Sequence, residues 1–214
     1  MQLLVYFVTV TSALIISIMA SLWVRHLNKK KLPPGTICVD IPSHPNTKTP
    51  GTALSRCIIS IAFGTGMILL FATLLFSIAG TWELLPSWII MEIPKPLSYI
   101  AYSILWLYYL WGILIIRYNV NYTPCYRSIA GRYYIATAGP YSIMRHPMYA
   151  AKAAFPIIMF CATGFFPFLI GLLSWTALRY QSIKEEEQMV ELGGNQYRQY
   201  LARTGRFSPR LIRK

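Results

Sequence analysis

Two groups of polar residues stand out in an otherwise apolar sequence. The first lies within residues 139–149, where glycine, proline, arginine, histidine and two tyrosines are crowded together directly before a long apolar run. Pro147 suits the first turn of a helix, because proline has no N–H to leave unpaired there and its φ is already helical. Arg145 and His146 are therefore expected at a helix N-terminus, where backbone N–H groups and the helix dipole favour an anionic ligand. The same pattern is also typical of a basic membrane anchor with interfacial tyrosines.

The second group is the acidic run Glu185, Glu186 and Glu187, which follows the apolar run. Three glutamates beside an anionic membrane leaflet are electrostatically unfavourable unless something cationic pairs with them. A local explanation is equally open. Ser182 and Glu185 match a capping box, and acidic side chains favour the first turn of a helix.

The apolar run between the two groups covers residues 147–179. As one helix it would extend ~50 Å at about 1.5 Å per residue, which is too long for a single membrane crossing. Gly164 and Pro167 predict a break, so we expect a tight helical hairpin with its turn at about residues 163–167. Because a hairpin brings its two ends together, both polar groups should meet at the same membrane face.

A site built in this way would have a cationic end, an acidic end and aromatic rings. S-adenosylmethionine matches it, since its carboxylate suits Arg145 or the helix N-terminus, its ammonium and ribose hydroxyls suit glutamates, and its sulfonium suits a tyrosine face. The sequence contains no Rossmann glycine loop, P-loop or HExxH motif. Its four cysteines show no spacing typical of a zinc site or a disulfide framework, so no metal is expected.

The rest of the chain is expected to hold these groups at a membrane. Apolar residues make up 55% of the sequence and the net charge is +13, which indicates an integral membrane protein whose basic side chains face anionic lipids rather than nucleic acid. Further spans are predicted at residues 3–24, 57–80 and 97–116. The predicted fold is therefore all-α, with five transmembrane helices, the last two a tight helical hairpin, and a cytosolic C-terminal helical tail that Gly193 and Gly194 interrupt.

The distribution of charge predicts the orientation. Of the 20 Lys and Arg residues, only Lys95 lies in a loop that this topology places outside, so the positive-inside rule puts the N-terminus outside and the C-terminus and the site in the cytoplasm. Residues 25–56 are rich in proline and are expected to form an irregular cytosolic loop. We divide the chain into an N-terminal membrane region, residues 1–131, and a region that carries the site, residues 132–214.

About the last third of the chain, residues 132–207, resembles the isoprenylcysteine carboxyl methyltransferase family. The resemblance is carried by Gly-Pro-Tyr and Arg-His-Pro-Met-Tyr within residues 139–149, by the hairpin and the Glu-Glu-Glu run, and by a Gly-x-x-Tyr-x-x-Tyr tail ending at Tyr200. It implies S-adenosylmethionine-dependent methyl transfer to a lipophilic or prenylated acceptor from the bilayer, with a carboxylate as the first expectation. Carried over by position, the implied cofactor-binding residues are Tyr134, Ile135, Ala136, Tyr141, His146, Pro147, Met148, Tyr149 and Glu185.

Arg145 and Glu186 are expected to be catalytic. A carboxylate acceptor needs no general base, whereas an amine acceptor must lose a proton, which Glu186 or His146 could take. Two positions depart from the family pattern. Gln181 stands where the family usually has an arginine linked to the substrate, and Gly193 stands where the family has an aromatic residue before the tail glycine.

The loss of that arginine leaves amine and thiol acceptors open. Three other functions also stay open. They are phospholipid N-methylation on the same architecture, an NADPH-dependent sterol-type membrane reductase, some of which end in an Arg-His-Pro-x-Tyr hairpin, and a non-catalytic membrane adaptor.

Overall fold

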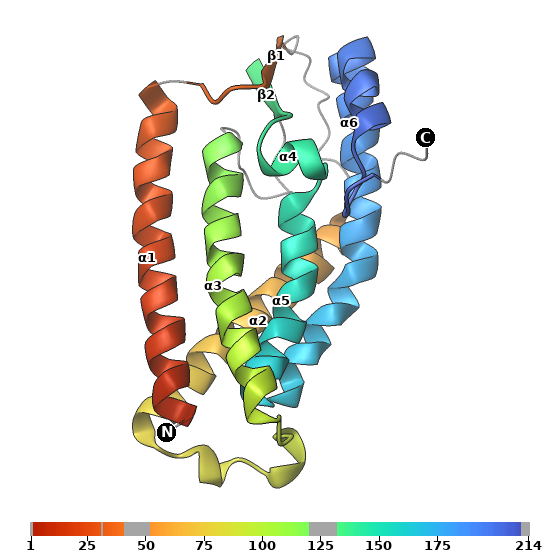
Figure 1. Ribbon diagram of the computed structural model, residues 1–214. Coiled ribbons are helices and arrows are strands. Elements are labelled where there is room, and N and C mark those ends of the chain that lie inside the picture. Colours follow the sequence, from red (N-terminus) through yellow and green to blue (C-terminus); the bar gives the residue numbers. More distant parts are fainter. Residues whose placement is uncertain (1, 31, 41–51, 120–131, 211–214) are drawn as a thin grey trace.

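The computed structural model describes residues 2–30, 32–40, 52–119 and 132–210 of the chain. The protein is mostly helical, and Figure 1 shows long helices with a small two-stranded sheet at one end. The long helices are α1 (Gln2–Lys30), α2 (Ala53–Ala79), α3 (Lys95–Tyr118), α5 (Pro147–Thr163) and α6 (Ser174–Arg203). The shorter elements are β1 (Thr36–Asp40), β2 (Arg132–Ala136), α4 (Pro140–Ile143) and the 3-10 helices η1 (Trp82–Leu84), η2 (Ser87–Ile89) and η3 (Phe166–Leu173).

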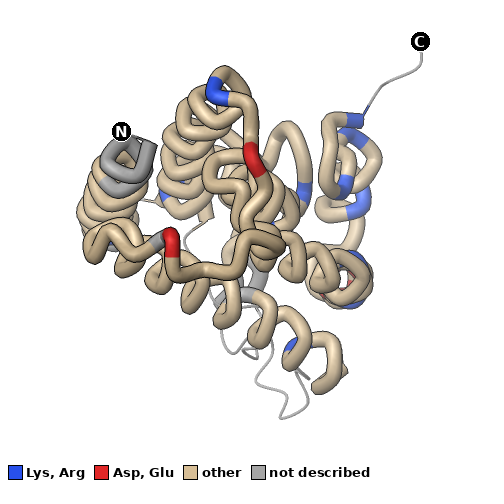
Figure 2. The backbone as a smooth tube through the Cα atoms, turned by 90° about the horizontal axis from the view of Figure 1, so that it is seen from below, with Lys and Arg blue, Asp and Glu red and all other residues tan. Residues whose placement is uncertain are grey.

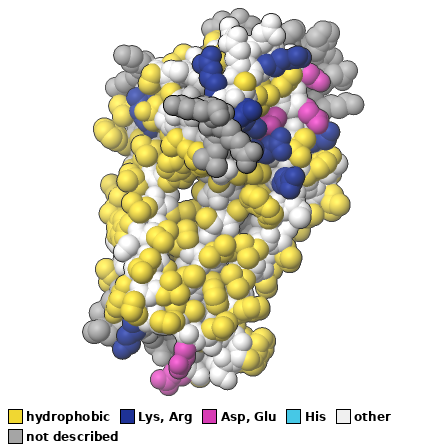
Figure 3. Space-filling model, turned by 45° about the vertical axis from the view of Figure 1, so that its right-hand side comes forward, with side chains coloured by type: hydrophobic (Ala, Val, Ile, Leu, Met, Phe, Trp, Pro, Cys, Tyr) yellow, Lys and Arg dark blue, Asp and Glu magenta, His cyan; other side chains and the backbone are white. Residues whose placement is uncertain are grey.

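Three helices are long and apolar enough to cross a membrane, namely α1 over Val8–Asn28, α2 and α3. Large apolar side chains such as Leu22 and Leu75 are exposed on their outer faces. Figure 3 shows apolar side chains covering the middle of the molecule, with charged side chains gathered toward its two ends. Such a surface is favourable against lipid rather than water. The predicted helical class is confirmed, and three of the predicted spans coincide with helices that could cross a membrane.

Helix α5 ends where the sequence predicted a break. Gly164 terminates it in the left-handed region, with a φ of 72°, and a Cβ at this position would lie 2.0 Å from the carbonyl oxygen of Met91. The returning arm differs from the expected tight pair of α-helices, because the chain first forms the 8-residue 3-10 helix η3. Gly171 of η3 lies so close to α5 that a Cβ there would be 2.7 Å from Cγ of Pro156.

Helix α6 carries the acidic run in its middle. Because α6 begins at Ser174, the capping box expected from Ser182 is wrong, and the Ser182 hydroxyl instead donates to the Arg179 carbonyl at 2.7 Å. The predicted interruption of the tail is confirmed, since Gly194 has a non-helical φ of 51° and ψ of −133°. The interruption comes after the glutamates, so α6 is continuous from Ser174 to the acidic run.

The irregular loop expected over residues 25–56 is wrong in three places, of which the first is that α2 already begins at Ala53. Helix α1 continues to Lys30, and Thr36–Asp40 forms β1, which pairs antiparallel with β2 so that Ile37 faces Ile135. The β-branched residues of β1 favour an extended backbone, and its partner strand lies almost a hundred residues away, beyond any local pattern. Pro42, Pro45, Pro50 and the region boundary expected at residue 131 lie outside the described residues.

A buried core joins the helices and sets where their ends lie. Its almost fully buried members include Val10 of α1, Leu70 of α2, Leu105 of α3, Met159 of α5 and Phe168 of η3. In Figure 1, the start of α5, the sheet and the C-terminal part of α6 all lie toward the end opposite the start of α1. Figure 2, seen from the N-terminal end, shows acidic and basic positions in the connections at that end, and further basic positions on the side that carries the C-terminal segment. The core thus places the start of α5 and the middle of α6 at the same end of the molecule.

Candidate functional site

The site begins at the short link between α4 and α5. Gly139, with a φ of 60°, opens α4, and a Cβ there would lie 2.5 Å from the Tyr118 ring. After α4 the backbone is extended at Met144 and bends at Arg145, and Pro147 then occupies the first turn of α5, as the sequence predicted. The link pairs with the C-terminal segment, because the Arg145 N–H donates to the Gly205 carbonyl at 2.9 Å and the His146 N–H donates to the Arg206 carbonyl at 3.0 Å.

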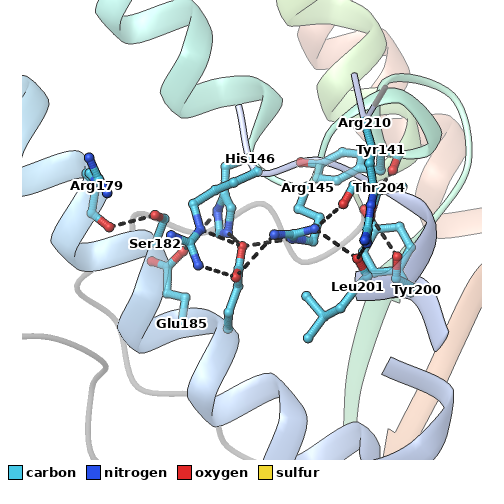
Figure 4. Close-up of polar contacts among 12 residues, drawn as sticks. Tyr141, Arg145, His146, Arg179, Ser182, Glu185, Tyr200, Leu201, Thr204 and Arg210 are labelled. Atoms are coloured by element: carbon cyan, nitrogen blue, oxygen red, sulfur yellow. Dashed lines mark hydrogen bonds and ion pairs between the residues drawn. The ribbon is translucent and has the colours of Figure 1, made fainter. Parts of the chain in front are cut away.

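Glu186 is the centre of a buried ion-pair network, and Figure 4 labels two of its partners, Arg145 and His146. Arg145 Nε donates to its Oε1 at 2.9 Å, Arg206 Nη2 donates to its Oε2 at 2.7 Å, and His146 Nε2 lies 3.1 Å from Oε1. The side chains of Glu186 and Arg145 are only 8% and 12% exposed. Arg145 also donates to the carbonyls of Leu201 and Thr204. The two residues expected to be catalytic, Arg145 and Glu186, therefore pair with each other.

These donors keep Glu186 ionised. Burial by itself would raise the pKa of the Glu186 carboxyl, but the hydrogen bonds from His146, Arg206 and Arg145 outweigh it and hold the pKa well below the usual range of a glutamate. A carboxylate held in this way is a poor proton acceptor. Its role in the fold is to tie α6 to the α4–α5 link and to the C-terminal segment.

Glu185 has a different environment from its neighbour. The Tyr149 hydroxyl donates to Oε1 at 2.5 Å, the Gln181 amide donates to the same oxygen at 3.3 Å, and Oε2 lies 3.6 Å from Nδ1 of His146. Burial raises the pKa of Glu185, and the positive influence of His146 and the hydrogen bonds from Tyr149 and Gln181 only partly oppose it. The two adjacent glutamates thus have pKa values shifted in opposite directions, which is typical of paired carboxylates with separate roles.

His146 connects the two glutamates. Its Nε2 faces Glu186 and its Nδ1 faces Glu185. Nε2 lies 3.1 Å from Oε1 of Glu186, within hydrogen-bond distance, whereas Nδ1 lies 3.6 Å from Oε2 of Glu185, which is an ion-pair distance only. Of the two glutamates, His146 is therefore within hydrogen-bond distance of Glu186 only.

Aromatic rings line the same region. His146 stacks on Tyr149 with ring centroids 5.3 Å apart and planes 13° apart, and Phe207 lies 6.0 Å from His146. Trp175 lies against Phe207 at 4.9 Å. These ring faces could attract a cationic ligand group.

Gln181, the expected substrate residue, is fully buried beside this cluster. Its amide oxygen accepts from the Ser55 hydroxyl at 3.2 Å, and its amide nitrogen donates to Glu185. Gln181 therefore links α2 to the site and orients Glu185.

Other predicted site residues belong to the packing around the α4–α5 link. Ile135 packs with Met189, Tyr197 and Tyr200, while Ala136 and Tyr141 pack against α3, with Met148 partly buried beside them. Tyr141 is held by two hydrogen bonds, as Asn119 donates to its hydroxyl at 2.8 Å and Tyr200 donates to its carbonyl at 2.6 Å. Ile135, Ala136 and Tyr141 thus belong to the packing that supports the link, whereas His146 and Tyr149 contact Glu185. Tyr134 lies in β2, opposite Cys38 of β1.

One glutamate of the acidic run lies outside the site, and two residues that contact the site were not predicted. Glu187, grouped with the other glutamates, has a 55% exposed side chain and pairs with Lys184 at 2.7 Å, outside the site. Arg206 and Phe207 were missed. They come from a tail with many basic residues, and no local spacing relates Arg206 to Glu186.

An apolar cavity of about 490 Å³ adjoins the polar cluster, between α2, α3, α5, η3 and the start of α6. Its lining includes Ile58 and Leu70 of α2, Phe168 of η3 and Leu178 of α6, and Lys152 of α5. The Nζ of Lys152 lies 5.9 Å from the centroid of the Tyr149 ring. The cavity and the polar cluster therefore share the start of α5.

No family model matches the chain, and no match is found among curated proteins. Within the part of the chain that the structure describes, no group of three or more His, Cys, Asp and Glu side chains is placed to hold a metal ion. The function proposed below is argued from the geometry of the site and from the motif resemblance.

Proposed function

We propose that this protein is a multi-pass membrane methyltransferase that uses S-adenosylmethionine and acts on a lipophilic acceptor, preferably a carboxylate such as that of a prenylated cysteine. The observation that carries the proposal is the meeting of His146, Tyr149 and Glu185 close to an apolar cavity, which Lys152, one turn beyond Tyr149 on α5, helps to line. Polar groups suited to a charged cofactor and an apolar chamber suited to a lipid chain adjoin there, which is what transfer between a cytosolic and a membrane-dissolved substrate requires. In this proposal α5 and the η3–α6 arm add a fourth and a fifth crossing to α1, α2 and α3, with the N-terminus outside.

The residues of the cluster fit S-adenosylmethionine in their chemistry. Glu185 offers a partly exposed carboxyl that could accept from the ammonium or the ribose hydroxyls, its side chain being 20% exposed. The stacked rings of His146 and Tyr149, with Phe207 beside them, offer π faces to a sulfonium. The N-terminus of α5 at Pro147 and Met148 favours the carboxylate of the cofactor.

Bound S-adenosylmethionine would supply a methyl group made electrophilic by the positively charged sulfur. The chain's own residues then have three tasks. The aromatic wall and the apolar cavity exclude water and so strengthen the electrostatic interactions that orient the acceptor. The pair of Arg145 and Glu186 fixes the link that carries His146. If the acceptor is an amine, Glu185 is the better base than Glu186, because its raised pKa allows it to hold a proton at Oε2, with Nδ1 of His146 alongside.

The experiment is calorimetric binding of S-adenosylhomocysteine to the purified full-length protein in detergent, with NADPH as a second ligand. The variants are His146→Ala and Glu185→Gln, and Glu187→Gln is the matched control, since it changes a neighbouring exposed glutamate of the same helix. We expect micromolar binding by the wild type and the control, and a loss of at least tenfold in affinity in the two site variants. Equal binding by all four proteins would place the cofactor elsewhere, and no binding by well-folded wild type would refute the proposal. Binding of NADPH instead would favour a reductase.

A non-catalytic role is the second candidate, and one observation favours it. Glu186 takes hydrogen bonds from Arg145, His146 and Arg206, so its network is complete within the chain and ties the C-terminal segment to α5. Such a tie is also what a structural adaptor needs. In that case wild-type protein binds neither S-adenosylhomocysteine nor NADPH, while Glu186→Gln still loosens the fold.

A further inference from the structure

Residues 204–210, the C-terminal strap, follow α6 and lie against the polar cluster. Two backbone hydrogen bonds hold the strap beside the α4–α5 link, donated by the N–H groups of Arg145 and His146 at 2.9 Å and 3.0 Å. Gly205 allows the strap to turn tightly, since a Cβ there would lie 2.0 Å from the carbonyl oxygen of Ser208. The strap is therefore docked on the residues that directly precede α5.

Phe207 of the strap covers the aromatic part of the cluster. Its ring lies 6.0 Å from the ring of His146 and 4.9 Å from that of Trp175, and it packs against the buried group that contains Tyr149 and Leu178. The His146 side chain is only 11% exposed, and Tyr149 is buried. A ligand that lies against these two rings needs their cover to move. The strap is the part of that cover that can move without unpacking a long helix.

Arg206 fastens the strap to α6. Its guanidinium donates twice to the Glu186 carboxylate, from Nε at 3.1 Å and from Nη2 at 2.7 Å. The Arg206 side chain is 30% exposed, against 12% for Arg145, which pairs with the same carboxylate. Because Arg145 and His146 also pair with Glu186, the carboxylate stays compensated when Arg206 departs. The strap can thus open by losing its most exposed ion pair while the buried part of the network stays formed.

We propose that the C-terminal strap is a lid on the cofactor cluster, with Arg206 as its latch and Phe207 as its cover, and that S-adenosylmethionine enters and leaves when the latch is open. This inference rests on the proposed function, because it concerns access to the same site. A strap that closes over a bound ligand excludes water from it. By linkage, a ligand held under the strap must in turn stabilise the contacts between the strap and the link. Arg206 is a positioning residue, since it acts on the ligand through the strap.

The first measurement is hydrogen exchange of single backbone amides in the full-length protein, in detergent and without ligand. The amides of Arg145 and His146 report the docking of the strap, because their hydrogen-bond acceptors are carbonyls of the strap. The amide of Gly164 is the internal reference. It donates to the Phe160 carbonyl at 2.7 Å, at the other end of α5, and reports whether the fold is kept.

The variants are Arg206→Gln, which removes the latch, and Arg206→Lys, which keeps its charge. The matched control is Arg203→Gln, which removes an exposed arginine from the last turn of α6. We expect Arg206→Gln to speed exchange at Arg145 and His146 by about tenfold or more, as the loss of one charge-assisted hydrogen bond would give, with Arg206→Lys in between. The control, and the Gly164 amide in every variant, should match the wild type. Unchanged exchange at both link amides in Arg206→Gln would overturn the latch.

The second measurement adds S-adenosylhomocysteine to the wild type and needs no variant. With ligand at about 100 times its dissociation constant, exchange at Arg145 and His146 should slow by at least about tenfold, the limit being about a hundredfold if the open form binds no ligand. Tritiated S-adenosylhomocysteine should also leave Arg206→Gln at least about tenfold faster than it leaves Arg203→Gln. Bound ligand that does not slow exchange at the two amides, or that leaves both variants equally fast, would overturn the inference.

The two proposals fail separately. If well-folded wild type binds no S-adenosylhomocysteine, the methyltransferase is refuted, and the ligand-free exchange comparison still decides whether Arg206 latches the strap. If S-adenosylhomocysteine binds and neither exchange nor release depends on the strap, the cofactor site stands and only the lid is refuted.

Discussion

Replacing Glu186 by glutamine removes the negative charge from the centre of the network while keeping the shape of the side chain. The carboxylate is 8% exposed and lies 2.9 Å from Arg145 Nε and 2.7 Å from Arg206 Nη2. Removing one partner of a buried ion pair typically costs about 3–5 kcal/mol, because the other charge stays buried without compensation. Glutamine keeps one acceptor oxygen, so we expect the low end, about 3 kcal/mol.

That loss corresponds to a midpoint of thermal unfolding lowered by about 6–12 °C, at about 2–4 °C per kcal/mol for a chain of this size. The assay is thermal unfolding followed by tryptophan fluorescence in detergent at pH 7. Glu187→Gln is the control, because its 55% exposed carboxylate forms a surface pair with Lys184 that should contribute less than about 1 kcal/mol. If Glu186→Gln and Glu187→Gln lower the midpoint equally, the buried network does not hold the C-terminal segment and the reasoning is refuted.

The same variant has a pH signature. The folded-state pKa of Glu186 lies below its unfolded value, so its stabilising contribution is fully present above the unfolded pKa of about 4.3 and is lost as the pH falls through the folded-state pKa. Wild-type protein should therefore lose more stability between pH 5 and pH 3, as a rough window, than Glu186→Gln does. Parallel losses in the two proteins would contradict the assignment of the ionised state to Glu186.

Two further predictions test neighbouring features. Glu185→Gln should raise the midpoint of thermal unfolding at neutral pH. Burial raises the folded-state pKa of Glu185, so ionisation above the unfolded value of about 4.3 opposes folding. The gain should vanish on acidification, and a lowered midpoint at neutral pH would show that the carboxyl does not resist ionisation. Gly164→Ala should destabilise by well over about 1 kcal/mol, since its φ is 72° and the new Cβ would meet the Met91 carbonyl at 2.0 Å. The matched control is Gly80→Ala, where φ is 65° but the space is open, and equal midpoints for the two glycine variants would show that the contact with Met91 does not constrain the turn.

The features that the sequence predicted are those governed by local chemistry. Long apolar runs specify helices of membrane length, because every backbone group must be satisfied within the segment in lipid. Pro147 starts α5 and Gly164 ends it because of their own φ preferences. Gly194 interrupts α6 for the same reason. The meeting of residues 145–149 with the glutamates also followed from the sequence, since a chain that turns back brings its ends together.

The roles within the site depended on packing between segments far apart in the chain. Successive residues of a helix point about 100° apart, so the three glutamates face different surroundings. Glu185 faces Tyr149, Glu186 faces the arginines and Glu187 faces solvent, and this assignment is set by the docking of α6. The same docking brings Arg206 to Glu186 and buries Gln181 against Ser55.

The sequence by itself thus determined the helices, their breaks and the two polar groups, because each depends on the residues within one segment. The tertiary structure alone decided three things: the pairing of β1 with β2, the opposite pKa shifts of Glu185 and Glu186, and the position of Lys152 in the lining of an apolar cavity. Each of these depends on burial and on the distance between charges from different helices, and both quantities are set only when the helices pack together.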